Sequence, residues 1–239
     1  MTPGPPRHIL LTGFEPFDGD TVNPSGEVAK LLDGKVIGDC VVRSVILPVQ
    51  HEAARAVVAP LLEAPGLAAV VHLGLAGGRA RISLERVAVN VMDYSRPDAH
   101  GQVLRDVPCV EGGPAAYFST LPLREILAGL TAEGIPAAIS NTAGTYLCND
   151  ILYTTLHALA QRGFSISAGF IHLPFFPSMV TAHNIEEPSM DLPMMIRAVE
   201  IALPRTDLEQ VKVIEKACPR VSATPQQSSR RAGAHAGQP

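Results

Sequence analysis

The chain has 239 residues, of which 46% are hydrophobic, enough to form one large α/β domain or two small ones. Its formal net charge is -4 and its cationic residues are scattered, so we expect no nucleic-acid partner. No apolar run is long enough for a membrane helix or a secretory signal, and we therefore expect a cytoplasmic protein with no membrane partner.

The composition of the two ends and the spacing of the cysteines indicate the domain organisation and the kinds of site to expect. Residues 1–7 are rich in proline and glycine, and residues 216–239 in serine, glutamine, arginine, glycine and alanine. We expect a flexible N-terminus, a single α/β domain over residues 8–215 and a disordered tail over residues 216–239. The four cysteines have no metal-type spacing, so we expect no metal site and no disulfide framework.

The first predicted element is a buried strand at residues 9–11. The loop that follows, residues 12–19, contains Phe14 and Phe17. Two aromatic residues in such a loop either pack beneath it or bind a ligand, since loops at strand ends often carry binding residues. A helix is predicted over residues 26–32, with Ser25 as its N-cap.

The next elements alternate between strand and helix. Residues 41–49 read as a strand, residues 51–62 as an amphipathic helix and residues 67–75 as a central strand buried on both faces. His72 lies within that apolar run, where it is most simply a core histidine with satisfied hydrogen bonds.

Residues 82–92 have mostly alternating apolar positions, interrupted by Glu85 and Arg86. One interpretation is an edge strand with Glu85 facing water. The other is a partly buried carboxylate that orients a histidine. A long loop over residues 93–114 is followed by predicted helices at residues 115–120 and 123–132.

Cys148 lies at a junction between a strand and a helix. Residues 137–140 are apolar, residues 141–144 form turns, and helical periodicity begins after Gly144. Cys148 is thus predicted in the first helical turn, where free backbone amides and the macrodipole favour a thiolate and could hold an oxyanion. Alternatively, it is a small residue of the core.

A last strand at residues 165–173 carries His172 at its carboxyl end, and a helix follows at residues 190–203. The alternation of strands and helices predicts an α/β fold, with a single open twisted and mainly parallel sheet covered by helices on both faces. Ligands bind at the carboxyl ends of strands in such sheets, so Cys148 and His172 are expected on the same rim. With Glu85, these residue types fit the nucleophile, base and orienting group of nucleophilic catalysis.

Several segments, in order and spacing, resemble the pyroglutamyl peptidase I (pyrrolidone carboxyl peptidase) family of cysteine peptidases. The similarity runs from about residue 8 to residue 203. Its matching segments are Leu-Thr-Gly-Phe-Glu-Pro-Phe at 11–17, Asn-Pro-Ser at 23–25, His-Leu-Gly-Leu-Ala-Gly-Gly-Arg at 72–79, Leu-Glu-Arg-Val-Ala-Val-Asn at 84–90, Ala-Tyr-Phe-Ser-Thr-Leu-Pro at 116–122, Tyr-Leu-Cys-Asn at 146–149, Gly-Phe-Ile-His at 169–172 and Pro-Ser-Met at 188–190.

The resemblance implies an enzyme that hydrolyses the amide bond after an N-terminal pyroglutamyl residue of peptides, without a cofactor and commonly as a cytosolic tetramer. Carried over by position, the functional residues of the family fall on two sets of residues in this chain. The catalytic set is Cys148, His172 and Glu85, and the substrate-binding set is Phe14, Phe17 and Asn23.

One segment departs from the family. Where the family typically reads Asp-Ala-Arg-Ile-Pro-Asp, residues 93–98 read Asp-Tyr-Ser-Arg-Pro-Asp. The arginine therefore moves by one position to Arg96, and one step in an extended segment reverses the direction of a side chain. The role of Arg96 near the site stays open.

Two other functions remain open from the residues. The first is a nucleoside phosphorylase-like enzyme in which the turn at residues 77–79 binds phosphate. The second is a non-catalytic protein that binds a small cyclic ligand in the same pocket.

Overall fold

A seven-stranded sheet forms the centre of the structure, a computed structural model that describes residues 5–203. The predicted tail at residues 216–239 and residues 1–4 of the predicted N-terminal segment lie outside the described residues. The strand order across the sheet is β2 (Val36–Ile37), β3 (Cys40–Leu47), β1 (His8–Phe14), β4 (Leu67–Leu75), β9 (Ser167–Leu173), β5 (Ile82–Glu85) and β8 (Ala137–Ser140).

The sheet is mainly parallel. Strands β3, β1, β4 and β9 run in one direction, and β5 and β8 run parallel to each other. However, β5 is antiparallel to β9, and the short β2 is antiparallel to β3. The predicted α/β fold with a single open sheet is confirmed, and the reversal of β5 is what brings its last residue beside β9.

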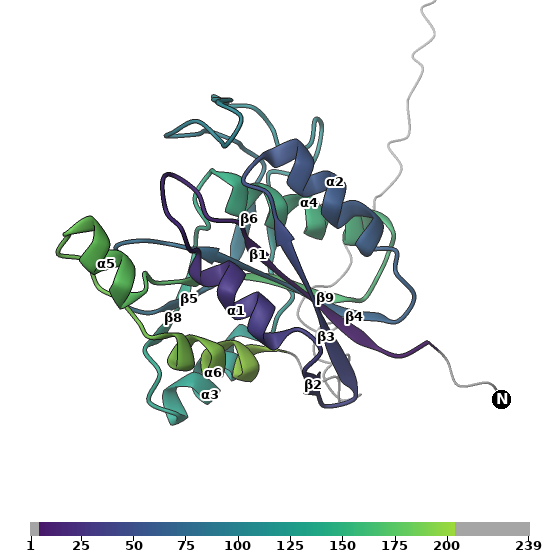
Figure 1. Ribbon diagram of the computed structural model, residues 1–239. Helices are drawn as coiled ribbons and strands as arrows, with labels where there is room; N and C mark the ends of the chain where they lie inside the picture. The colour runs from purple at the N-terminus through teal and green to yellow at the C-terminus, as the bar shows by residue number, and fades with distance from the viewer. Residues whose placement is uncertain (1–4, 204–239) are drawn as a thin grey trace, which may run out of the picture. The chain divides into compact units, whose positions relative to one another are not determined.

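Helices cover both faces of the sheet (Figure 1). Apolar side chains of α1 (Pro24–Leu32), α3 (Leu123–Ala132) and α6 (Leu192–Ala202) pack on one face, together with the short α5 (Pro177–His183). Side chains of α2 (His51–Leu61) and α4 (Leu147–Gln161) pack on the other face. Each helix buries one apolar stripe, which is the arrangement that gives a two-sided α/β core.

The strand predicted at residues 82–92 is divided in two. After Glu85 the chain leaves the main sheet, and β6 (Val87–Val89) forms a separate antiparallel pair with β7 (Ala116–Phe118). The helix predicted at residues 115–120 is therefore wrong, because these residues are held by pairing with β6. The charged interruption in the sequence marks the point at which the chain changes sheets.

The start of α1 also differs from the prediction. Asn23, not Ser25, is the N-cap, and its side-chain oxygen accepts a hydrogen bond from the Ser25 amide at 3.1 Å. The Ser25 hydroxyl oxygen instead accepts from the Phe14 amide at 3.0 Å and donates to Asn23. These bonds fix the loop between β1 and α1, which carries the predicted aromatic residues. Helix α5 and strand β2 were not predicted.

Residues 5–203 lie within one compact unit. Among them, no helix is both long enough and apolar enough to cross a membrane.

Candidate active site

The antiparallel pairing of β5 with β9 places Glu85 beside His172. Ser83 is directly opposite His172, so Glu85, two residues further along β5, is its diagonal neighbour on the same face of the sheet. The His172 Nδ1 atom lies 2.8 Å from Glu85 Oε1, and both side chains are buried. The water-facing edge-strand interpretation of Glu85 is therefore wrong.

The same Glu85 oxygen has a second partner. The guanidinium of Arg79, on the turn between β4 and β5, donates a hydrogen bond of 2.7 Å to Oε1. Burial by itself raises the pKa of Glu85, but the hydrogen bond and charge of His172, followed by the side chains of Ser140 and Arg79, lower it below its ordinary value. Glu85 is therefore an anion that only accepts hydrogen bonds.

This fixes how His172 carries its proton. Desolvation by burial, together with the charge of Arg79, lowers the pKa of His172 more than the hydrogen bond and charge of Glu85 raise it. The ring is thus neutral near pH 7. Because an anionic Glu85 can only accept, the one ring proton is on Nδ1, and Nε2 has a lone pair available to take a proton.

Cys148 is the second residue of α4, as predicted, and its sulfur lies against the strand next to His172. A Cβ atom built on Gly74 would be only 3.1 Å from Cys148 Sγ. Gly74 is the register partner of His172 across β4 and β9. The absence of a side chain at residue 74 therefore gives the sulfur its place over the sheet, on the face that carries His172.

The expected thiolate is not the resting form. Burial, followed by the charge of Glu85, raises the pKa of Cys148 to about 12, while Arg79 lowers it. Burial thus outweighs the favourable position at a helix start. Cys148 holds a proton near pH 7, and a base must remove that proton before the sulfur can attack.

The first turn of α4 keeps its backbone donors available. Tyr146, the N-cap of α4, makes no side-chain capping hydrogen bond to these amides. The amides beside Cys148 therefore provide partial positive charge at the position where an oxyanion would form.

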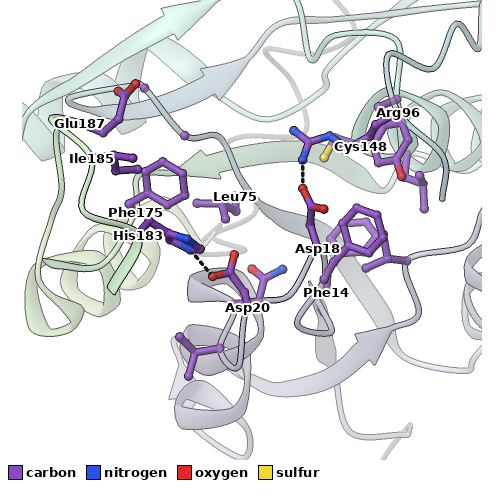
Figure 2. Close-up of a pocket in the computed structure, with 18 residues that line it drawn as sticks. Phe14, Asp18, Asp20, Leu75, Arg96, Cys148, Phe175, His183, Ile185 and Glu187 are labelled. Carbon is purple, nitrogen blue, oxygen red and sulfur yellow. Dashed lines mark hydrogen bonds and ion pairs between the residues drawn. The ribbon is translucent and has the colours of Figure 1, made fainter. Parts of the chain in front are cut away.

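Cys148 lines a cavity of about 650 Å³. Figure 2 shows Phe14, Asp18 and Arg96 on the side of the cavity nearer Cys148, and Phe175, His183, Ile185 and Glu187 on the opposite side. The cavity thus lies between the segments that carry Cys148 and Phe14 on one side and the segment around Phe175 on the other.

The predicted binding residues Phe14, Phe17 and Asn23 all line this cavity with Cys148. Phe14 is buried and Phe17 is half-buried. Both polar groups of the Asn23 side chain already have partners, because Nδ2 donates to the Glu15 carbonyl at 3.0 Å and Oδ1 caps α1. Asn23 therefore shapes the loop that holds the two aromatic rings.

Arg96 also lines the cavity. Its guanidinium lies 2.6 Å from the Asp18 carboxylate, and more than half of each side chain is exposed. His183 reaches across from the end of α5 to Asp20 in a similar way, at 2.6 Å. These two polar contacts join separate segments at the mouth of the cavity.

Some lining residues had no separate signal in the sequence. Tyr146 directly precedes Leu147 within a matching segment, so its position could have been found there. By contrast, the lining residues Phe175, His183, Ile185 and Glu187 follow β9 in a segment whose helix was not predicted.

The core interpretation of His72 is confirmed. The side chain is fully buried, with Nδ1 at 2.7 Å from the Thr12 hydroxyl and Nε2 at 3.0 Å from the Thr155 hydroxyl. It does not line the cavity. Within residues 5–203, no group of three or more histidine, cysteine, aspartate or glutamate side chains could hold a metal ion.

The chain is similar to known proteins over most of its length. The family described as pyroglutamyl peptidase matches residues 7–207. The pyrrolidone-carboxylate peptidase of Pyrococcus furiosus is 44% identical over 198 residues, which are 82% of this chain and 95% of that protein. That of Klebsiella pneumoniae is 47% identical over 195 residues, 82% of this chain and 90% of that protein.

Solved structures give the same result. A structure of pyrrolidone carboxyl peptidase from the hyperthermophile Pyrococcus furiosus has a TM-score of 0.80 at 43% identity, covering 85% of this chain and 99% of that one. Pyroglutamyl peptidase I from Bacillus amyloliquefaciens has a TM-score of 0.79 at 37% identity, covering 82% of this chain and 94% of that one. With both sequence and fold matched over most of its length, the chain belongs to the pyroglutamyl peptidase family.

Proposed function

We propose that this protein is a cysteine peptidase that removes the N-terminal pyroglutamyl residue from peptides through an acyl-enzyme. The observation that carries the proposal is the buried contact of 2.8 Å between His172 Nδ1 and Glu85 Oε1, on the sheet face where Cys148 begins a helix. Such a set supplies the nucleophile, the base and the orienting group that peptide-bond cleavage needs.

In the first step, His172 Nε2 takes the proton of the Cys148 thiol as the sulfur attacks the carbonyl carbon after the ring. A carbon–sulfur bond forms, and the carbonyl electron pair moves to oxygen, where the free amides at the start of α4 stabilise the negative charge. Glu85 stabilises the imidazolium. The carbon–nitrogen bond then breaks, and His172 gives its proton to the departing amine.

In the second step, His172 takes a proton from water as the water oxygen attacks the thioester carbon. Collapse of this intermediate breaks the carbon–sulfur bond, releases pyroglutamate and returns the proton to Cys148. The rings of Phe14 and Phe17 provide an apolar wall for the flat, uncharged lactam. An acyclic N-terminal residue would lose the hydration of its charged amine there, which favours the cyclic residue.

The phosphate-binding alternative is less well supported. It needs the turn at residues 77–79 to present Arg79 to an anion, but that guanidinium is already paired with Glu85. The non-catalytic alternative leaves the Glu85 and His172 pair without a purpose, although a buried pair of this kind is costly to form.

Further properties follow from family membership and are part of the proposal. The substrates are peptides that begin with pyroglutamate, and we propose no nucleic-acid or membrane partner. We also propose that the enzyme is cytoplasmic, works without a metal or other cofactor and forms a homotetramer. Light scattering on the purified protein would measure the assembly.

The test of the function is release of a fluorescent amine from a pyroglutamyl amide in a reducing buffer. Wild-type protein is expected to turn this substrate over and to leave the matching prolyl amide intact. Cys148→Ser is expected to lose the activity, because a serine hydroxyl is a far weaker nucleophile beside a histidine arranged for a thiol.

Cys109→Ala serves as the matched control, since Cys109 is a buried thiol whose pKa is also raised to about 12 by burial and which does not line the cavity. It is expected to keep wild-type activity. Loss of activity in both variants, or turnover by neither the wild type nor the variants, would disprove the assignment of Cys148. Activity that requires phosphate would favour the phosphorylase-like alternative.

A further inference from the structure

Among residues 5–203, Arg79 is the one cation that shares the Glu85 oxygen with His172. Its guanidinium donates to Glu85 Oε1 at 2.7 Å, and the His172 contact to the same atom is 2.8 Å. The Glu85 side chain is fully buried, whereas a third of the Arg79 side chain is exposed. Arg79 therefore reaches from the surface to an acceptor that is otherwise shielded from water.

The turn that carries Arg79 has little freedom. Gly78 has a φ of +77°, a conformation that residues with side chains rarely adopt. A Cβ atom on Gly77 would lie 2.4 Å from the Phe175 ring. These two glycines bring the chain close under Phe175 and fix where the next residue, Arg79, begins.

The charge of Arg79 acts on all three proposed catalytic groups. It lowers the pKa of His172 and that of Cys148, and its hydrogen bond lowers the pKa of Glu85. The charged and titratable groups that act on His172 come from β5, which carries Glu85, and from the turn before it, which carries Arg79. The charges of the same two residues, Glu85 and Arg79, act on Cys148 of α4.

We infer that Arg79 is a positioning residue of this site, which holds the Glu85 carboxylate toward His172 and sets the pH range in which His172 can act as a base. This inference rests on the proposed function, because the base matters only if Cys148 is the nucleophile. Arg79 touches no substrate atom in this role and acts through Glu85.

Loss of the Arg79 charge would move the pH dependence of activity upward. Without the positive charge, His172 would hold a proton up to a higher pH, so the acid limb of kcat/KM would move upward. The Cys148 thiol would also hold its proton to a higher pH, so its thiolate fraction at a given pH would be smaller. For one unit charge near partly buried groups, a shift of roughly half a pH unit or more is expected.

The experiment measures kcat/KM against pH for wild type, Arg79→Gln, Arg79→Lys and the control Arg81→Gln. Arg81 is on the same turn and is exposed, so its variant makes the same change in net charge away from Glu85. Arg79→Gln is expected to move the acid limb upward. Arg79→Lys keeps the charge, so the acid limb of its kcat/KM is expected at the wild-type pH. Its kcat is expected to be lower, because the guanidinium geometry is lost.

A purely structural role gives a different pattern. It lowers the stability of Arg79→Gln and leaves the acid limb in place, and this result would overturn the inference. An equal shift in Arg81→Gln would also overturn it, because the effect would then be one of net charge. If Arg79→Gln does not fold, the folded Arg79→Lys variant decides. A shift of its acid limb would count against the inference, and an unshifted acid limb with reduced kcat would support it.

A second measurement does not depend on turnover. The rate at which iodoacetamide alkylates Cys148, followed at the level of the peptide by mass spectrometry, reports the thiolate fraction at each pH. At a fixed pH below the pKa of Cys148, this rate is expected to be lower in Arg79→Gln than in wild type. If wild type does not cleave the pyroglutamyl amide, the proposed function fails. An alkylation rate in Arg79→Gln equal to that of wild type shows separately that Arg79 does not act on this site.

Discussion

The sulfur of Cys148 is packed against Gly74, on the strand beside His172. A Cβ atom at residue 74 would lie 3.1 Å from this sulfur and 2.7 Å from the ring of Phe170. Both distances are shorter than ordinary contacts of a Cβ atom, so even a methyl group has to displace one of these neighbours. The position of the proposed nucleophile therefore depends on a residue that has no side chain.

Gly74→Ala is expected to lower kcat/KM by about tenfold or more, because the sulfur or the ring beside His172 must move. Overpacking of this kind should also reduce the free energy of unfolding by about 1–3 kcal/mol. The measurements are pyroglutamyl amide turnover and urea denaturation.

Gly129→Ala is the matched control. A Cβ there would lie 2.9 Å from one methyl group of Ile201, on the face of α3 that packs on α6 and away from the cavity. Its activity is expected to equal that of wild type. Unchanged activity in Gly74→Ala as well would mean that the sulfur is not held by this contact.

Glu85→Gln tests the orienting role of the carboxylate. The amide group has nearly the same shape, but it has no charge to stabilise the imidazolium and can present a donor to Nδ1, which would put the ring proton on the wrong nitrogen. A decrease in kcat of about 100-fold or more is expected. KM should change little, since Glu85 does not line the cavity.

Glu186→Gln makes the same chemical change at an exposed residue and controls for loss of one negative charge. It should leave kcat as in wild type. A Glu85→Gln protein that folds and keeps its kcat within about twofold would rule out the triad.

The order of elements was predictable because apolar periodicity and glycine turns act locally. The strand before Cys148, its helix and the position of His172 at a strand end all followed from such patterns. The direction of β5 did not, since residues 82–92 alternate in the same way whether the strand runs parallel or antiparallel. Yet that reversal is what places Glu85 diagonally across from His172.

Other features depend on distances between residues far apart in the chain. The sequence offered Ser25 as the helix cap, while the loop conformation gave that role to Asn23. The charge state of Cys148 was also misjudged, because the benefit of a helix start is visible in sequence and the cost of burial is not. Arg79 was noted only as part of a turn, and its bond to Glu85 became apparent in three dimensions.

Asp150, two residues after Cys148, anchors the first turn of α4. Its buried carboxylate accepts hydrogen bonds from Arg55 of α2, one of them at 2.9 Å from Arg55 Nε. Asp150→Asn leaves this guanidinium without its counter-charge in a partly buried position, so it should reduce the free energy of unfolding by about 2–4 kcal/mol. Urea denaturation would measure the loss.

The matched comparison is Glu63→Gln, which removes the partner of Arg162 from an exposed pair. Screening by water limits such a pair to less than about 1 kcal/mol. Equal losses in the two variants would show that burial does not strengthen the Arg55 and Asp150 contact.

His72 should make the stability of the protein depend on pH. Burial lowers its pKa from the ordinary value of 6.5 to about 3 in the folded protein. Above pH 6.5 the residue is neutral in both the folded and the unfolded chain. As the pH falls from 6.5 toward 3, only the unfolded chain takes up the proton, so stability is lost in this window, by roughly 3 kcal/mol at pH 4.

The His72→Gln variant isolates this contribution, because an amide can still bond to the hydroxyls of Thr12 and Thr155 but takes up no proton. Its free energy of unfolding, measured by urea denaturation at several pH values, should fall less steeply than that of wild type between pH 6.5 and 4. His172 also has a pKa lowered by burial and adds to the acid sensitivity of both proteins, so the difference between their slopes reports His72 alone. His100→Gln, at an exposed loop position, controls for removing a histidine. Parallel curves for wild type and His72→Gln would mean that His72 gains a proton in the folded protein as readily as in the unfolded chain.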